Sequence, residues 1–355
     1  EHLAMTEDCG IVNLSHFYMF DVEGPDHVAL MEWLCAARIG GDANIGKGIY
    51  THFLDDEGMV RADLTVIRMA DRCRVIDGAD AGPRDYHYLR RLAEDKGWDV
   101  TVTDVTEKFV TIGIWGPNAR TTLQKVVEDP AGLAPENFPF AAIKQIRIGG
   151  KNVTAFRISY VGEQGWELHM KYEDGLAVWD ALRSTGVMAF GVETYANSRR
   201  MEKSLRLQNA DLITQYNLIE ADLARPKVKE ADFRGKAKHL EYKARAHQPA
   251  MLCTLVMTEN TDAKGVKRYP VGSMPVMDPA TGEVLVDELG RRSYTTSVAY
   301  GPTIGKNIAL AYLPHAYAQE GRKLTVNYFG EDYPVEVAGV GYKPLYDPEN
   351  LKPRS

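Results

Sequence analysis

Apolar and polar residues alternate along short runs in the first part of the chain, and this pattern predicts β-strands. Residues 11–20 (IVNLSHFYMF) predict one strand. Residues 49–54 and 60–69, which are separated by an Asp-Asp-Glu-Gly turn, predict a hairpin. Residues 158–170 (ISYVGEQGWELHM) predict a strand, a turn with two glycines and a second strand. We expect such strands to be half buried, with apolar side chains on one face.

Segments with a helical period lie between these strands, and their character changes near residue 245. The predicted helices are residues 27–38, 83–96, 119–127, 172–184 and 197–207. Residues 241–249 are basic and polar and predict a linker. From residue 250 on, short β-like runs alternate with Gly, Pro and Asp turns. We therefore predict an α+β fold with a C-terminal all-β domain, divided into residues 1–245 and 250–355.

Composition narrows the class of protein. A chain of 355 residues with 45% hydrophobic and 26% charged residues is typical of a globular protein with two or three domains. Its net charge of −7 argues against binding nucleic acid. The sequence contains no run of about 18 apolar residues, so it predicts no membrane span. The chain begins with Glu1 rather than Met, which is compatible with a segment trimmed or excised from a longer protein.

The cysteines and histidines do not predict a metal site. The four cysteines are far apart and form no C-x-x-C pair, and the nine histidines have no ligand spacing. We expect the cysteines to be small buried apolar residues in a reduced compartment, and we predict a cytoplasmic protein.

Two acids stand out on the predicted strands. Asp63 lies between Ala62 and Leu64, and Glu167 lies between Trp166 and Leu168. A carboxylate on a half-buried strand needs a partner or a ligand. Strand alternation could equally turn either acid toward solvent, so the pattern alone leaves both interpretations open.

The neighbourhood of these acids resembles the folate-binding aminomethyltransferase family. Residues 160–167 (YVGEQGWE) are similar to the Y-x-G-E-x-G-x-E motif of that family, which includes the glycine-cleavage T-protein and the C-terminal halves of dimethylglycine and sarcosine dehydrogenases and oxidases. Residues 62–66 (ADLTV) match the dimethylglycine and sarcosine branch. Further similar segments follow in family order: GIVNLS at 10–15, GIWGPN at 113–118, NSRRMEK at 197–203, DFRG at 232–235 and GPTIGK at 301–306.

The resemblance implies a three-lobed disc with a central channel for tetrahydrofolate. Two intertwined α+β lobes would form residues 1–245, and residues 250–355 would form a β-barrel-like domain. By motif, Glu167 is the carboxylate that accepts both donors of the pterin edge, and Tyr160 is its companion. Asp63 matches the catalytic aspartate near the folate amines, where it can take a proton as the new bond forms.

The anionic tail of folate requires a local basic patch. Arg225 and Lys227 are one candidate for this patch, and Arg68 with Arg72 and Arg74 is another. Either group could equally be a solvated surface.

The resemblance implies tetrahydrofolate-dependent transfer of a methyl or methylene group from a methylated amine. A partner domain or subunit would be an FAD amine dehydrogenase, since no FAD fingerprint occurs in the sequence. Two departures from the family pattern affect donor selection: Asn197 replaces an Asp, and residues 204–209 (SLRLQN) replace an aromatic-rich R-x-W-G segment. The alternatives are a non-catalytic folate-binding module and a demethylase of a betaine or sulfonium donor that makes 5-methyltetrahydrofolate.

Overall fold

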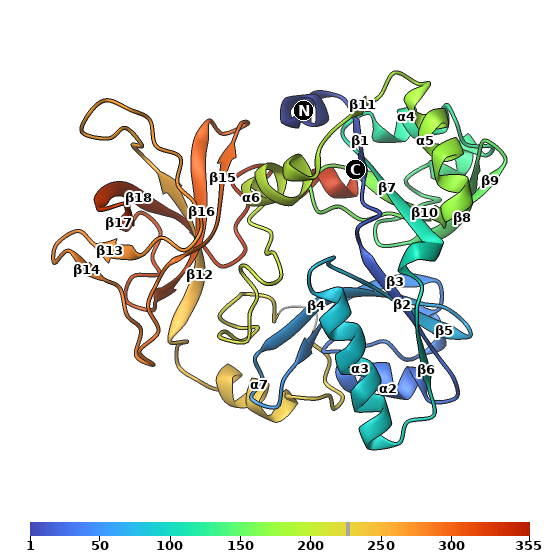
Figure 1. The fold of residues 1–355 in the computed structure, drawn as a ribbon, viewed down its shortest axis with the longest axis horizontal. Helices are drawn as coiled ribbons and strands as arrows, with labels where there is room; N and C mark the ends of the chain where they lie inside the picture. Colours follow the sequence, from blue (N-terminus) through green and yellow to red (C-terminus); the bar gives the residue numbers. More distant parts are fainter. Residues whose placement is uncertain (225–227) are drawn as a thin grey trace.

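The strands of the protein form three sheets placed around the middle of the molecule (Figure 1). The computed structural model describes residues 1–224 and 228–355. In Figure 1 the seven-stranded sheet lies on the left, and the six-stranded and five-stranded sheets lie at the upper and lower right. Helices accompany the two sheets on the right, so the α+β character predicted from the sequence is confirmed.

The six-stranded sheet carries Glu167. Trp166 and Leu168 lie in the core cluster on one face of this sheet, together with apolar side chains of α4 and α5. In sheet order, its strands are β11 (Met188–Ala189), β1 (Gly10–Asn13), β7 (Phe109–Trp115), β10 (Gly165–Lys171), β9 (Lys151–Phe156) and β8 (Ile143–Ile148).

The five-stranded sheet carries Asp63. One face packs on α2 and α3 through a separate apolar cluster. In sheet order, its strands are β3 (Lys47–Leu54), β4 (Val60–Arg68), β5 (Arg72–Asp77), β2 (Tyr18–Glu23) and β6 (Thr101–Asp104). The predicted hairpin is confirmed as β3 and β4, which pair in antiparallel register on either side of a turn at Gly58 with positive φ.

The seven-stranded sheet contains only strands that follow residue 249, which confirms the predicted C-terminal β region. In sheet order, its strands are β14 (Glu283–Val284), β13 (Val276–Asp278), β17 (Lys323–Tyr328), β18 (Glu331–Val340), β12 (Ala250–Met257), β16 (Lys306–Pro314) and β15 (Thr295–Gly301).

Helices of the described residues are mostly short. None of them is both long and apolar enough to cross a membrane. The α-helices are α1 (His2–Glu7), α2 (His27–Leu34), α3 (Gly82–Lys96), α4 (Ala119–Gln124), α5 (Gly175–Arg183), α6 (Arg200–Glu202) and α7 (Lys236–Lys243). Shorter helical segments are Asp42–Asn44, Thr106–Lys108, Pro130–Leu133, Tyr172–Asp174, the π-helix η5 (Thr194–Arg199) and Lys352–Arg354.

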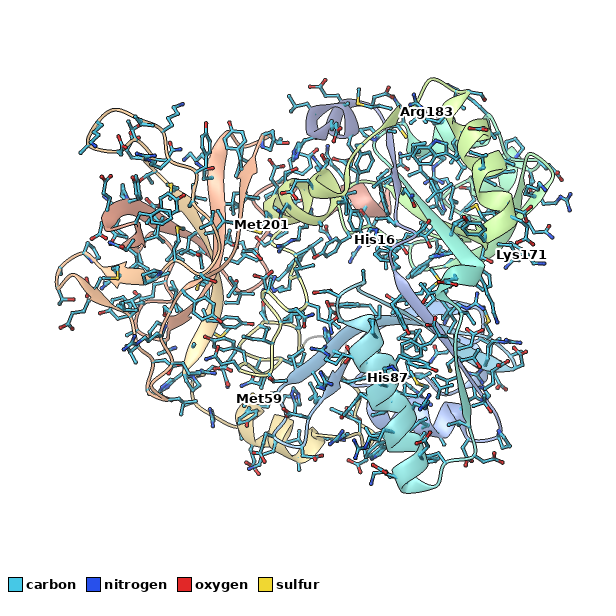
Figure 2. The ribbon with its side chains drawn as sticks, in the orientation of Figure 1. His16, Met59, His87, Lys171, Arg183 and Met201 are labelled. Atoms are coloured by element: carbon cyan, nitrogen blue, oxygen red, sulfur yellow. The ribbon has the colours of Figure 1, made fainter. Side chains whose placement is uncertain are left out.

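The prediction of one strand over residues 11–20 is wrong, because the chain crosses between two sheets there. β1 belongs to the six-stranded sheet and β2 to the five-stranded sheet. The break is a turn in which the Phe17 amide donates to the Leu14 carbonyl and the Ser15 amide donates to the Asn13 side chain. Without glycine or proline to mark it, this turn continues the alternating pattern. His16, labelled in Figure 2, lies at the crossover.

Three other predicted elements end differently in the structure. Residues 158–164 form an irregular loop, since side chains rather than a strand ladder hold their backbone; Arg199, for example, donates to the Val161 carbonyl. The predicted helix over 197–207 ends at Glu202, because Ser204 has a positive φ and bonds to the C-terminal part of the chain. The predicted linker at 241–249 is partly helical, since α7 extends to Lys243.

Candidate active site

Strand alternation places Asp63 on the face of the hairpin opposite the core. Ala62 and Leu64 pack in the apolar cluster under the five-stranded sheet. Asp63 therefore points the other way, yet its side chain is only 12% exposed, so it is not a solvent-facing acid. Its Oδ1 atom is buried and has no hydrogen-bond donor.

His52 and Tyr50 lie on the same face as Asp63. His52 is the direct cross-strand partner of Asp63, and its Nε2 lies 3.3 Å from Oδ1 in a geometry that falls short of a hydrogen bond. The same Nε2 lies 3.1 Å from the Tyr50 hydroxyl. Burial raises the pKa of Tyr50 well above its usual value, and the neighbouring Asp63 carboxylate raises it further. These three side chains therefore form one buried polar group.

Glu167 has the corresponding position on the six-stranded sheet. Its neighbours on β10 point into the core, and Glu167 lies on the other face, opposite Gly113 of β7. Glu167 is 7% exposed. His169 follows on the same face with its Nε2 3.5 Å from Oε2, and Thr111 bonds to the other ring nitrogen at 2.9 Å. The Trp115 ring covers Gly113, where an added Cβ would approach it within 2.0 Å.

Two tyrosines that lie close to each other are electrostatic neighbours of the two acids. The ring centroids of Tyr160 and Tyr195 lie 5.3 Å apart. Burial raises the pKa of Tyr195, with Glu167 as the next cause, whereas burial raises the pKa of Tyr160 and Asp63 is among the further causes. Asp63 thus affects the pKa of Tyr160, and Glu167 affects the pKa of Tyr195. The Tyr160 hydroxyl donates to the Arg206 carbonyl at 2.6 Å, which fixes its loop against the segment after α6.

The two candidate groups of basic residues for the folate tail differ in what the structure says of them. Arg225 and Lys227 lie outside the described residues. Arg74 forms an ion pair with Asp21 at 2.7 Å, and Arg72 forms one with Glu23 at 2.7 Å. Arg68 donates to the Met69 carbonyl. Arg68, Arg72 and Arg74 are therefore already engaged in contacts within the protein.

Sequence reasoning missed His52, Tyr50, His169 and Tyr195. The first two could have been placed on the face of Asp63 from the hairpin. A register centred on the Asp55–Gly58 turn pairs Asp63 with Tyr50, and the irregularity between Phe53 and Leu54 makes His52 the partner instead. It also missed the burial of Glu163, which was interpreted as a turn residue. Glu163 is 1% exposed and pairs with Arg199 at 2.7 Å.

The described residues contain no group of three or more His, Cys, Asp or Glu side chains arranged to hold a metal ion. All four cysteines are buried and unpaired. Burial raises the pKa of Cys9 to about 12 and that of Cys73 to about 11, so these thiols stay protonated at neutral pH.

Comparison with known proteins agrees with this architecture. Residues 1–228 match the family model of the GCVT N-terminal domain, and residues 266–347 match that of the glycine cleavage T-protein C-terminal barrel domain. The structure is similar to the crystal structure of glycine cleavage system aminomethyltransferase T from Bartonella henselae, with a TM-score of 0.76 and 22% identity over 97% of this chain and 89% of that one. This likeness shows the shared fold.

Relatives with two different names are among the curated proteins that match this chain. Mitochondrial dimethylglycine dehydrogenases of Rattus norvegicus and Homo sapiens are 30% identical over 95% of this chain. The chain spans only 38% and 37% of their respective lengths. An aminomethyltransferase of a Picosynechococcus strain is 29% identical over 98% of this chain and 89% of its own length.

The two family models, matched at residues 1–228 and 266–347, define the class of this chain as aminomethyltransferase-type. The chain belongs to the glycine cleavage T-protein family. Members of this family use tetrahydrofolate as substrate and cofactor.

Proposed function

We propose that this chain transfers a one-carbon group from a methylated amine of the dimethylglycine or sarcosine type to tetrahydrofolate. The observation that carries the proposal is the arrangement of Asp63 and Glu167. They belong to different sheets, and both face away from their cores. The rings of Tyr160 and Tyr195 lie 5.3 Å apart, and Asp63 and Glu167 are electrostatic neighbours of Tyr160 and Tyr195, respectively.

Glu167 is the proposed pterin anchor. A pterin presents a 2-amino group beside a ring N–H, and a carboxylate accepts both donors at once in short, strong bonds. Glu167 is buried enough for such bonds to be protected from water, and no lysine or arginine pairs with its charge among the described residues. Tyr160 adds an aromatic surface. Arg225 and Lys227 remain the proposed contacts for the anionic tail.

Asp63 is the proposed catalytic residue. Its buried Oδ1 lacks a donor, so an amine N–H of bound tetrahydrofolate would satisfy it. Tetrahydrofolate supplies the nitrogen nucleophile when bound. Asp63 orients that nitrogen and takes its proton, and the Asp63 charge offsets positive charge that develops nearby. Holding both reactants in the same site supplies much of the remaining rate.

The relatives and the A-D-L-T-V match support a dimethylglycine or sarcosine type of donor. A partner FAD dehydrogenase, as another domain or subunit, would supply the oxidised one-carbon unit. The segment after α6 differs from the demethylating flavoenzymes in having Gln208, whose amide donates to Asp85 at 3.1 Å. This polar replacement is the reason to include betaine and sulfonium donors in the test.

Product analysis tests the function. The protein is incubated with tetrahydrofolate and a panel of methylated amines, betaines and sulfonium compounds, with and without an FAD amine dehydrogenase, and folate products are identified by mass. We expect a methyl- or methylene-tetrahydrofolate with a dimethylglycine or sarcosine donor. Turnover only with a betaine or sulfonium compound would replace the proposed donor. Tetrahydrofolate binding without any product would identify a non-catalytic module.

A binding measurement tests the anchor. We expect Glu167→Ala to weaken tetrahydrofolate binding by about 10- to 100-fold, because one charge-assisted contact contributes about 1.5–3 kcal/mol. Calorimetric titration measures this change. Glu173→Ala, which alters an exposed acid near the end of the same strand, is the matched control. Equal affinities of the wild type and the Glu167 variant would refute the assigned role.

A further inference from the structure

The contact between His52 and Asp63 is fixed by the hairpin that carries both residues. They are direct cross-strand partners of β3 and β4, and both point away from the apolar core. The His52 ring is 2% exposed and cannot turn toward bulk water. Its Nε2 is within 3.3 Å of Asp63 Oδ1 and within 3.1 Å of the Tyr50 hydroxyl.

In this position, the protonation of the His52 ring affects the ionisation and the orientation of the Asp63 carboxylate. An ionised carboxylate only accepts hydrogen bonds, so a proton on Nε2 favours it. The 3.3 Å separation brings Nε2 into electrostatic contact with the carboxylate, while the Tyr50 hydroxyl lies within hydrogen-bond distance of the same nitrogen. In a buried site such a contact and the ring's charge act more strongly than in water.

We propose that His52 is a positioning residue that acts through Asp63. With a proton on Nε2, it holds the Asp63 carboxylate ionised and oriented. When the ring also carries a positive charge, the same contact makes Asp63 a weaker base. Transfer therefore requires His52 in its neutral, Nε2-protonated form. The inference rests on the proposed function of Asp63 and adds a residue that the family motifs do not include.

Other charged and titratable groups surround this pair. Tyr50 lies beside His52 on β3, Tyr160 approaches from the loop 158–164, and Arg206 approaches from the segment after α6. Asp77 lies at the end of β5. Burial raises the pKa of Asp77 to about 8, and the neighbouring carboxylates of Asp85 and Asp63 contribute to this rise. A pKa near 8 makes Asp77 change its charge within the pH range of the kinetic experiment, so it must be removed in a parallel variant.

Two substitutions separate the hydrogen bond from the charge. His52→Gln keeps an N–H donor that does not titrate, and His52→Leu removes the donor. Steady-state kinetics are measured from pH 5.5 to 9 with tetrahydrofolate and the donor that supports wild-type turnover. We expect wild-type kcat to be higher at pH 9 than at pH 5.5, because any positive charge on the His52 ring lowers the basicity of Asp63. The Gln variant should lose this difference and keep the rate that the wild type has at pH 9.

The Leu variant should lose rate at every pH. We expect kcat to fall about 10- to 100-fold, the equivalent of one hydrogen bond to a charged group, while KM for tetrahydrofolate stays within about threefold. His87→Gln, which changes an exposed histidine on α3 (Figure 2), is the matched control. Asp77→Asn in the wild-type and Gln backgrounds identifies any part of the pH profile that belongs to Asp77.

A binding experiment gives a readout that does not depend on turnover. Calorimetry of tetrahydrofolate binding at neutral pH in two buffers of different ionisation enthalpy counts the protons exchanged. The wild type and His52→Gln should differ in the number of protons exchanged, because the His52 ring and the ligand amine both contact the Asp63 carboxylate. His87→Gln should match the wild type.

The outcomes distinguish the inference from the proposed function. A wild-type rate and pH profile in both His52 variants, with unchanged proton exchange, would overturn the inference and leave the function of Asp63 intact. Absence of transfer in the wild type would instead contradict the proposed function.

Discussion

Glu163 and Glu167 are four residues apart in one motif, yet their surroundings assign them different roles. Glu163 is neutralised by Arg199 and accepts a hydrogen bond from Tyr346 at 2.9 Å. The ion-pair contact of Glu167 is to a histidine, 3.5 Å away. A carboxylate whose charge is already paired has a structural role, whereas Glu167 has capacity left for a ligand.

Asp77 makes stability depend on pH. Burial, with Asp85 and Asp63 as neighbours, raises the pKa of Asp77 to about 8 from an ordinary value of 3.8. Between these values the folded protein holds a proton that the unfolded chain releases, so stability falls as pH rises through that window. We expect Asp77→Asn to stabilise the protein by on the order of a few kcal/mol at pH 8 and by much less at pH 5.

Urea unfolding at both pH values measures this effect. Asp95→Asn, at an exposed position near the end of α3, controls for loss of one surface charge and should have little effect at either pH. An equal effect of Asp77→Asn at pH 5 and pH 8 would contradict the raised pKa.

At the scale of elements, local pattern predicted the β3–β4 hairpin and the position of Asp63 on it. Alternation specified which side chains share a face, because the period of a strand is two. It could not show that the loop 158–164 and the segment after α6 approach the face opposite the core. Tyr160 reaches the site through that loop, and the contacts that hold the loop are distant in sequence.

The buried pair of Glu163 and Arg199 ties the loop to the π-helix η5. Glu163→Ala leaves the Arg199 guanidinium, which is fully buried, without its ion-pair partner. We expect a loss of about 3–5 kcal/mol in the free energy of unfolding. Glu128→Ala breaks an exposed pair with Arg147 at 3.0 Å and should cost no more than about 1 kcal/mol. Similar losses in the two variants, measured by urea unfolding, would refute the structural role of Glu163.

At the scale of the whole molecule, family resemblance predicted what local patterns could not. The crossover at residues 14–17 has no turn residues that stand out, so alternation alone predicted one strand in one sheet. The resemblance of motifs across the chain predicted the three-lobed fold, which the comparisons confirm. Tyr195 was not predicted, because its position depends on which surfaces meet after folding. His52 was missed because an irregularity in the β3–β4 hairpin shifts the register that the turn alone indicates.

The C-terminal β region is packed against the rest of the chain through an apolar junction. Leu54 and Leu218 lie in one cluster with Leu252 and Ile308. Tyr216 stacks on Tyr312 with ring centroids 3.5 Å apart and an interplanar angle of 4°. The predicted boundary near residue 245 therefore divides a shared core.

We expect residues 1–245 alone to lack a cooperative unfolding transition, because truncation exposes this junction to water. Thermal unfolding followed by circular dichroism tests the prediction, with the full chain as control. A sharp, reversible transition of the truncated chain would show that residues 1–245 fold independently.

The most direct test of the central claim is the transfer rate of Asp63→Asn with tetrahydrofolate bound. The substituted amide keeps the shape of the side chain but cannot take a proton. We predict that calorimetric affinity for tetrahydrofolate stays close to that of the wild type, while the single-turnover rate, followed by the mass of the folate product, falls by about 100-fold or more. An unchanged rate would show that Asp63 is not the catalytic carboxylate.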